Sequence, residues 1–303
     1  MSDDALAAEE CVPRSEGPWS SPPSSFEKPR SFSYPRGPMK ALTLAALCLS
    51  LCPPSAALAA GAGLACFERR PEPDSVRAMR LTAHAAAGEK TVIILRLYGR
   101  RVPEGLGQLF LRIEEPENLH GTSLLMLQRE DGESDIYLAS PEHPTPRPIR
   151  GPERTQGMFG TDFSYEDLER VQHGWRPGAA EIVELPPKTV NDRPAYVVEV
   201  RPRDSRWERI VFSLDQESCL PLLIRFFEPG MELPRKELTV DPHSHVKHGE
   251  LWVVHSAIMR DREPDTTTHM MVDSHAQEAL LPDGQFTVEG LERAVRGDAK
   301  PSE

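Results

Sequence analysis

The chain has 303 residues, of which 39% are hydrophobic, 27% charged and 6% aromatic, so it can bury one sizeable core or at most two small ones. Its 35 Lys and Arg against 47 Asp and Glu leave a formal net charge of -12 without a groove-sized basic cluster, which argues against a nucleic-acid partner. The 30 prolines and 20 glycines recur between short apolar stretches. This pattern is typical of an antiparallel β protein with many turns, and it excludes helical bundles and membrane channels.

The N-terminal part of the chain predicts two segments that precede any folded domain. Residues 1–38 carry scattered charge and almost no aliphatic periodicity, so they are predicted to be disordered. Met39 with the basic Lys40, the apolar run 41–51 and the small residues that follow have the order of a secretory signal peptide over residues 39–59. We therefore expect translation to begin at Met39 and the mature protein to be periplasmic. A membrane anchor is disfavoured because the apolar run is too short for roughly 30 Å of hydrocarbon.

The mature chain is expected to form a single domain over residues 60–296, followed by a disordered tail at 297–303. It keeps two of the five cysteines, Cys66 and Cys219. An even pair in an oxidising compartment favours a disulfide, which for a loop this long would stabilise the fold by roughly 4–5 kcal/mol. The alternative is that Cys66 is a lipidated first residue, but position 63 is a glycine, whereas a lipobox has a large aliphatic residue three positions before the cysteine.

Alternating apolar residues predict short strands with one face toward a core. In residues 91–98 and 108–115, the alternation points every second side chain inward while Arg96 and Arg112 face water. The inward residues of the clearest strands are Ile93, Leu95, Leu97, Leu109, Leu111, Ile113, Tyr196, Val198, Val200, Ile210, Phe212, Leu214, Leu222, Ile224 and Phe226. Further segments lie at 76–84, 122–128, 135–139, 233–240, 250–257 and 266–273. Together they predict about ten or eleven strands in one large antiparallel sheet.

Only two helices have clear start signals. Ser164 followed by Asp167 predicts a helix over residues 165–172, and Thr287 followed by Gly290 predicts another over 288–295. A sheet this large with so few helices must curl on itself or leave a hollow. The expected fold class is therefore mainly β (α+β), a strongly curved antiparallel sheet or half-barrel with short helices forming a lid.

Residues 157–168 read Gly-Met-Phe-Gly-Thr-Asp-Phe-Ser-Tyr-Glu-Asp-Leu. This segment resembles the Phe-Met-Gly-Ser-Asp-Phe-Ser-Tyr-x-Asp-Leu signature of the LolA-like outer-membrane lipoprotein-sorting proteins, with Met158-Phe159 inverted and Thr161 in place of Ser. Similar segments flank it in the family's order, at 116–125, 135–138, 214–221 and 284–291. The resemblance spans about residues 66–294 and implies a LolA/LolB-like half-barrel.

The signature segment is also where we expect a hydrophobic site. Phe159, Phe163, Tyr165 and Leu168 form an apolar face at helical spacing, next to two glycines, and are predicted to act as a lid. The cavity wall is predicted to comprise Ile93, Leu95, Leu97, Leu109, Leu111, Phe212, Ile224 and Phe226. The alternative is that these side chains are ordinary core and enclose no cavity. Asp162 is expected to be a turn or cap residue.

A metal site is the main alternative to the hydrophobic site. His243, His245 and His248 lie near Asp241, and His255, His269 and His275 follow. On a strand, His243 and His245 would share a face and could bind Zn²⁺ or Cu²⁺. Asp241-Pro242 and His248-Gly249 instead favour a hairpin loop with solvated imidazoles, so no metal site is predicted. The chain has no H-E-x-x-H motif, G-x-S-x-G elbow or Walker loop, so we expect no catalytic residues, no cofactor and no enzyme activity.

The resemblance implies a carrier of lipid or lipoprotein acyl chains, for outer-membrane lipoprotein sorting or exporter-linked lipid transport. Burial of an acyl chain is favourable by about 0.8 kcal/mol per CH₂. The implied mechanism is opening and closing of a lid at residues 159–168, in a monomer that takes its cargo from an inner-membrane exporter. The alternative function is a non-catalytic accessory or scaffold module of an inner-membrane transport complex, without cargo.

Overall fold

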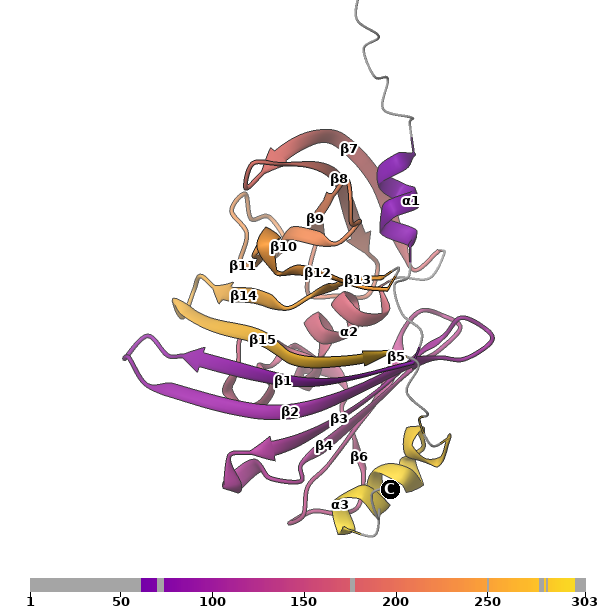
Figure 1. The fold of residues 1–303 in the computed structure, drawn as a ribbon. Helices are drawn as coiled ribbons and strands as arrows, with labels where there is room; N and C mark the ends of the chain where they lie inside the picture. The colour runs from indigo at the N-terminus through magenta and orange to yellow at the C-terminus, as the bar shows by residue number, and fades with distance from the viewer. Residues whose placement is uncertain are drawn as a thin grey trace, which may run out of the picture. The chain divides into compact units, whose positions relative to one another are not determined.

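A computed structural model describes residues 61–69, 74–174, 178–249, 251–277, 281 and 283–297 (Figure 1). Contacts divide the chain into Met1–Pro53 and Pro54–Glu303, and all the described residues lie in the second unit. The predicted disordered segment 1–38, the signal peptide 39–59 and all of the tail beyond residue 297 lie outside the described residues. None of the described helices is long and apolar enough to cross a membrane.

Thirteen strands form one antiparallel sheet, and two more form a separate hairpin. The strands of the sheet are β1 (Ser75–His84), β2 (Lys90–Arg101), β3 (Gly107–Glu115), β4 (Ser123–Gln128), β5 (Ser134–Ala139), β6 (Arg147–Pro148), β7 (Ala180–Val190), β8 (Arg193–Pro202), β9 (Arg209–Asp215), β10 (Pro221–Phe227), β11 (Lys236–Val240), β14 (Ser256–Asp261) and β15 (Thr266–Gln277). The hairpin is β12 (His245–His248) and β13 (Leu251–Val254).

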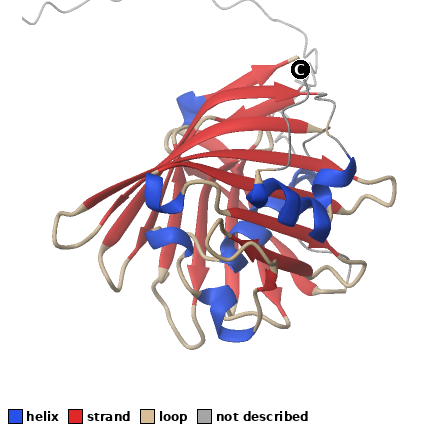
Figure 2. Cartoon of the chain, turned by 90° about the horizontal axis from the view of Figure 1, so that it is seen from below, coloured by secondary structure: helices blue, strands red, loops and turns tan. Residues whose placement is uncertain are grey.

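The sheet consists of two meanders joined in the middle. Its order is β6-β5-β4-β3-β2-β1-β15-β14-β11-β10-β9-β8-β7, and β1 pairs with β15 from Ser75 opposite Gln277 to His84 opposite Thr267. The sheet is not closed, because β6 and β7 remain as its two edges. It curves around a central helix in both views (Figures 1 and 2). The predicted fold class, a strongly curved antiparallel sheet with short helices, is confirmed.

The helices are short. The α-helices are α1 (Ala62–Glu68), α2 (Tyr165–His173) and α3 (Val288–Arg296), and the 3₁₀ helices are η1 (Glu117–Leu119), η2 (Gly151–Thr155), η3 (Met158–Gly160), η4 (Pro242–Ser244) and η5 (Asp283–Phe286). Both predicted start signals are confirmed. Ser164 Oγ accepts from the Asp167 N–H at 3.1 Å while Asp167 Oδ2 accepts from the Ser164 N–H at 3.0 Å, and Thr287 Oγ1 accepts from the Gly290 N–H at 2.9 Å.

Helix α1 was not predicted, and it carries one half of the disulfide. Cys66 on α1 is bonded to Cys219, which lies in the turn between β9 and β10, so the predicted disulfide is confirmed. Glu184 of β7 reaches the other end of this helix, where its Oε1 accepts from the Gly63 N–H at 3.0 Å. Helix α1 is thereby held against the β7–β9 half of the sheet.

The structure has more strands than the sequence pattern predicts. Strand β7 was not predicted because it has no regular apolar alternation, carries three charged residues and contains Pro186-Pro187, features that suit an edge strand. It pairs only with β8, and the register shifts between Leu185 and Lys188, where the prolines lie. The strand predicted at 250–257 is also wrong in its extent, because the chain breaks at His255 into β13 and β14.

Three apolar clusters flank the sheet, namely a small group of Val197, Val211 and Phe227 and two others. The larger lies on the concave side and includes inward residues of both meanders together with Phe67 of α1. The smaller joins α3 to β3 and β4, where Leu291 and Val295 pack with Phe110 and Leu125. Helix α3 therefore covers the convex side of the sheet and takes no part in the concave interior.

Candidate functional site

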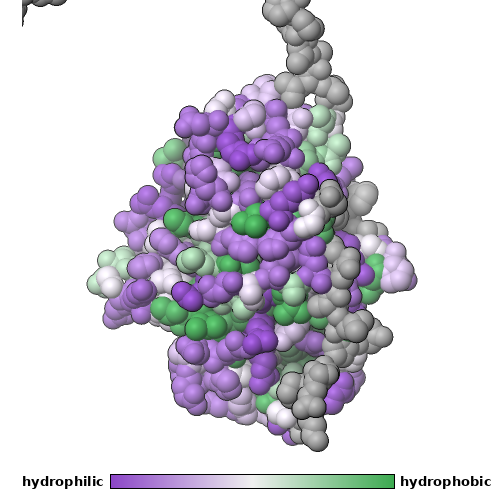
Figure 3. All heavy atoms as spheres, in the orientation of Figure 1, coloured by the Kyte–Doolittle hydropathy of each residue, from purple (hydrophilic) through white to green (hydrophobic). Residues whose placement is uncertain are grey.

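The concave side of the sheet holds a cavity of about 230 Å³. Its walls come from β1, β2, β3, β11, β14 and β15, from α2, and from the β12–β13 hairpin. The apolar lining residues are Met79, Leu81, Leu95, Leu97, Leu109, Leu111, Met158, Phe163, Leu168, Val171, Leu220, Leu238, Val240, Val253, Val254, Ala257, Met270 and Val272. On the outer face drawn in Figure 3, hydrophilic residues predominate and hydrophobic ones form scattered groups. A contiguous apolar surface is thus found inside the curved sheet.

Helix α2 is oriented opposite to an ordinary amphipathic helix. Its charged residues Glu169 and Arg170 are only 0% and 2% exposed, whereas Leu168 and Val171 are half-buried and line the cavity. A helix that covers a filled core normally buries its apolar stripe and leaves its charges in water. Here the charges are covered by protein and the apolar stripe faces a hollow.

The buried polar side of α2 is held by ion pairs. Arg154 contacts Glu169, and Arg170 Nη2 lies 2.7 Å from Oε1 of Glu133, which Arg154 also reaches at 3.2 Å. Burial raises the pKa of the Glu169 carboxyl, although the two arginines act in the opposite direction. Burial likewise raises the pKa of Glu166, whose carboxylate accepts from the Ser205 hydroxyl. These contacts fix which side of α2 faces the cavity.

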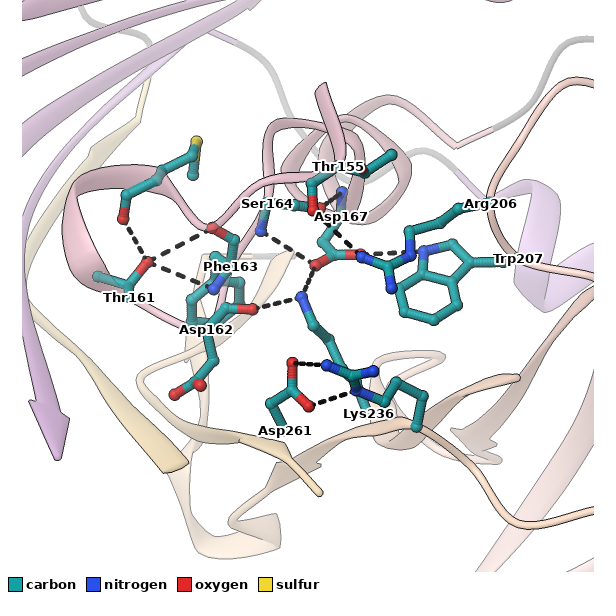
Figure 4. Close-up of polar contacts among 12 residues, drawn as sticks. Thr155, Thr161, Asp162, Phe163, Ser164, Asp167, Arg206, Trp207, Lys236 and Asp261 are labelled. Carbon is teal, nitrogen blue, oxygen red and sulfur yellow. Dashed lines mark hydrogen bonds and ion pairs between the residues drawn. The ribbon is translucent and has the colours of Figure 1, made fainter. Parts of the chain in front are cut away.

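The first turn of α2 is anchored by a second buried network (Figure 4). Lys236 Nζ donates to Asp167 Oδ2 at 2.8 Å and to the carbonyl oxygen of Asp162 at 2.7 Å. Trp207 Nε1–H donates to the other carboxylate oxygen of Asp167 at 3.0 Å. Asp167 therefore caps its own helix and joins it to β11 and to the segment before β9.

Asp162 lies in the turn before α2, as one of the two predicted alternatives has it, but it does not cap the helix. Ser164 is the cap, and the Asp162 carboxylate accepts from the hydroxyls of Thr266 and Thr268, the latter at 2.6 Å. The Asp162 N–H in turn donates to Thr268 Oγ1 at 2.9 Å. Asp162 thus attaches the signature segment to β15, more than a hundred residues away along the chain. No local pattern reveals such a partner.

A tight turn precedes α2 and uses both glycines of the signature segment. A Cβ on Gly157 would lie 2.5 Å from the carbonyl oxygen of Thr161, and Gly160 has a positive φ of 76°. The turn directs Met158 and Phe163 into the apolar cavity, while Gly157, Gly160 and Thr161 border a second, polar cavity of about 510 Å³.

Comparison with known proteins gives the family and the fold. A family model with the description "Uncharacterized protein" matches residues 105–293, which is more than half of the chain. The chain belongs to this family. No curated protein matches the chain.

Three solved structures share the fold. A domain from Vibrio parahaemolyticus described as an outer membrane lipoprotein-sorting protein has a TM-score of 0.68 at 20% identity, covering 76% of this chain and 95% of its own. A DUF1329 family protein from Desulfovibrio piger has a TM-score of 0.69 at 15% identity, with 76% and 96% covered. A LolA superfamily protein from Nitrosomonas europaea has a TM-score of 0.57 at 15% identity, with 74% and 94% covered. The resemblance to the LolA-like proteins is thus confirmed for the fold.

Within this LolA-like fold, the predicted site residues fall into two groups. Those that line the cavity are Leu95, Leu97, Leu109, Leu111, Phe163 and Leu168. Those that pack in or against the main core outside it are Ile93, Phe159, Tyr165, Phe212, Ile224 and Phe226.

Phe212, Ile224 and Phe226 of the second group lie outside the cavity because other residues fill the β8–β10 half of the concave side. The ring of Phe67 on α1 packs against Phe212 at 5.1 Å between centroids, and Trp207 packs against Phe226 at 5.3 Å. The β12–β13 hairpin, with Trp252, Val253 and Val254, supplies a wall that sequence reasoning did not assign to the site. Neither filling residue could be placed from periodicity, because both lie outside the alternating strands.

The histidines do not match the solvated loop that the sequence predicts. His243 is exposed in η4, but His245 is 8% exposed and contacts Ser218 Oγ at 3.2 Å, and burial lowers the pKa of His245. Nε2 of His248 lies 3.0 Å from Nε2 of His255. In the part of the chain that the structure describes, no three His, Cys, Asp or Glu side chains are grouped to hold a metal ion.

Proposed function

We propose that this protein is a periplasmic carrier that binds a lipid or the acyl chain of a lipoprotein in the apolar cavity. The observation that carries this proposal is the orientation of α2, whose charges are buried while Leu168 and Val171 face the hollow. A half-buried apolar surface of this kind is stabilised when a hydrocarbon covers it, by about 0.8 kcal/mol per buried CH₂. The relative from Vibrio parahaemolyticus, described as lipoprotein-sorting, supports the same class of cargo.

Export to the periplasm is part of the proposal. The Cys66–Cys219 disulfide supports it, because disulfides persist in oxidising compartments. The carrier would act as a monomer that receives cargo from an inner-membrane exporter and serves outer-membrane lipoprotein sorting or lipid transport.

The movable wall in this proposal is the β12–β13 hairpin. The cavity of about 230 Å³ is below the roughly 300–1,000 Å³ of typical small-molecule sites, so a long chain enters only if a wall moves. Movement of the lid that the sequence predicts at residues 159–168 would break the buried Lys236–Asp167 and Arg154–Glu169 ion pairs. The hairpin strands pair only with each other and lie outside the main sheet, so displacing them leaves its ladder intact.

The test measures uptake of a neutral fluorescent hydrophobe, N-phenyl-1-naphthylamine, and identifies co-purified lipids by native mass spectrometry. The variant Val171→Asp places a charge on the cavity side of α2, and Val183→Asp is the matched control on the exposed face of β7. We expect wild type and Val183→Asp to bind the probe, and Val171→Asp to lose at least about tenfold in affinity, since burying an unpaired carboxylate against the probe costs more than 1.4 kcal/mol. Equal binding by both variants would contradict the proposal. A wild type that carries no lipid and binds no probe would favour the scaffold function instead.

A further inference from the structure

The permanently charged side chains among the described residues that line the apolar cavity are arginines. The side chains of Arg77 and Arg101 lie in the inward rows of β1 and β2, His173 also lines the cavity, and no Asp or Glu is among its described lining residues. The Arg100 guanidinium lies instead over the Phe286 ring, on the convex side of the sheet. The whole sequence has 47 acidic against 35 Lys and Arg residues, so the lack of acidic side chains among the described lining residues runs against the composition of the chain. A basic wall on a low-dielectric cavity concentrates positive potential there.

Arg77 and Arg101 lie toward one end of the cavity, on neighbouring strands. Along β1 the inward residues run from Leu81 through Met79 to Arg77, and along β2 they run from Leu95 through Leu97 and Gly99 to Arg101. The strands are antiparallel, with Met79 opposite Leu95 and Arg77 opposite Leu97. Both inward rows therefore change from aliphatic to arginine in the same direction.

His173 lies at this same end. Arg101 is opposite Gly107 of β3, and a Cβ on Gly107 would lie 2.6 Å from the His173 ring at the end of α2. Because residue 107 is a glycine, the His173 imidazole packs directly against β3, beside the Arg101 position of the neighbouring strand β2. The basic end of the cavity is built from β1, β2 and α2 together.

The arginines have protein contacts, and these do not prevent anion binding. Arg101 Nη1, for example, donates to the Gly105 carbonyl oxygen at 2.9 Å. A guanidinium has five N–H donors and can bind an oxyanion while it keeps another partner.

We propose that the cavity selects an anionic amphiphile, with its chain among the aliphatic residues and its carboxylate or phosphate head at Arg77 and Arg101. This inference rests on the proposed function and adds the chemical class of the cargo. The inference concerns only the head group of the ligand. The experiment that tests it therefore uses ligands with the same hydrocarbon chain and different head groups.

The experiment compares three ligands with a twelve-carbon chain, namely laurate, dodecyl phosphate and the neutral glycerol ester monolaurin. Each displaces N-phenyl-1-naphthylamine from the wild-type protein. We expect at least one of the anions to bind about tenfold or more tightly than monolaurin, since hydrogen bonds between a guanidinium and an anionic oxygen are stronger than those to a neutral ester or hydroxyl. A preference for laurate over dodecyl phosphate, or the reverse, identifies the carboxylate or the phosphate as the natural head.

The variants are Arg77→Gln and Arg101→Gln, with Arg80→Gln as the control. Arg80 lies on β1, but its side chain is 47% exposed, points away from the cavity and pairs with Asp273. We expect the ratio of anion to monolaurin affinity to fall below about threefold in the first two variants and to stay at the wild-type value in Arg80→Gln. Should the buried Arg77→Gln fail to fold, Arg101→Gln, at a half-buried position, carries the same test.

Equal affinity of the wild type for all three ligands would overturn this inference and leave the proposed function standing. An unchanged ratio in Arg101→Gln would also overturn it. Failure of all three ligands to bind would overturn the proposed function itself.

Discussion

Lys236 Nζ lies 2.8 Å from Oδ2 of Asp167, and the two side chains are 4% and 0% exposed. The pair joins β11 to the first turn of α2, so it determines where the helix lies against the sheet. A buried pair is not in itself evidence of a large stabilisation, because desolvation opposes the attraction. Removing one partner of the pair lowers the stability of the fold strongly, because it leaves the other charge buried and uncompensated.

We therefore predict that Lys236→Ala destabilises the fold by about 3–5 kcal/mol. The exposed Lys90→Ala at the start of β2 is the control and should change stability by less than about 0.5 kcal/mol. Urea unfolding followed by circular dichroism measures both. A loss below about 1 kcal/mol in Lys236→Ala would show that the pair does not hold α2 in place.

A second prediction concerns pH and the buried Glu169. Burial raises the pKa of this carboxyl in the folded state, so the folded protein holds its proton more tightly than the unfolded chain does. The resulting stabilisation is present below the unfolded-state pKa of about 4.3 and is lost as the pH rises through the raised folded-state pKa. Relative to Glu169→Gln, the wild type should lose stability over that window. Unfolding free energies measured from pH 4 to 7.5 test this, with the exposed Glu130→Gln as control. Parallel curves for wild type and Glu169→Gln would refute it.

A third prediction concerns the disulfide, whose cysteines are 153 residues apart. Replacing both with serine should lower the free energy of unfolding by roughly 5 kcal/mol in the chain-entropy description of a loop of this length. Adding dithiothreitol to the wild type should reproduce this loss and should leave the double variant unaffected. A reductant effect on the double variant would mean that the loss has another source.

A fourth prediction tests the turn before α2. Gly157 has an ordinary negative φ of -62°, so alanine fits its backbone conformation, but the added Cβ would lie 2.5 Å from a backbone oxygen. We expect Gly157→Ala to cost about 1–3 kcal/mol through this overlap. In Gly99→Ala the new Cβ has only an ordinary 3.7 Å contact with Ser75 Oγ, and it serves as the control. Equal thermal stability of the two variants would show that the turn can relax.

Much of the secondary structure follows from neighbouring residues. Alternation of apolar and polar residues at 91–98 and 108–115 predicts β2 and β3, and the pair Ser164 and Asp167 predicts the start of α2. The alternation of residues does not predict strand β7, because an edge strand needs no apolar face and tolerates proline. Neighbouring residues do not predict helix α1 either, because the strands it packs against, β7 and β8, are more than a hundred residues away in the chain.

The sequence by itself determined the strand periodicity, the cap of α2 and the likeness of its signature segment to the LolA-like proteins, because each is a matter of residues close together in the chain. Only the tertiary structure decided that β1 pairs with β15, that Asp162 binds the threonines of β15, and that Phe67 and Trp207 fill one half of the concave side while the other half stays hollow. An inward leucine has the same place in a periodic pattern whether it touches a phenylalanine or an empty cavity. What covers it depends on segments distant in the chain, and these meet only when the sheet curves.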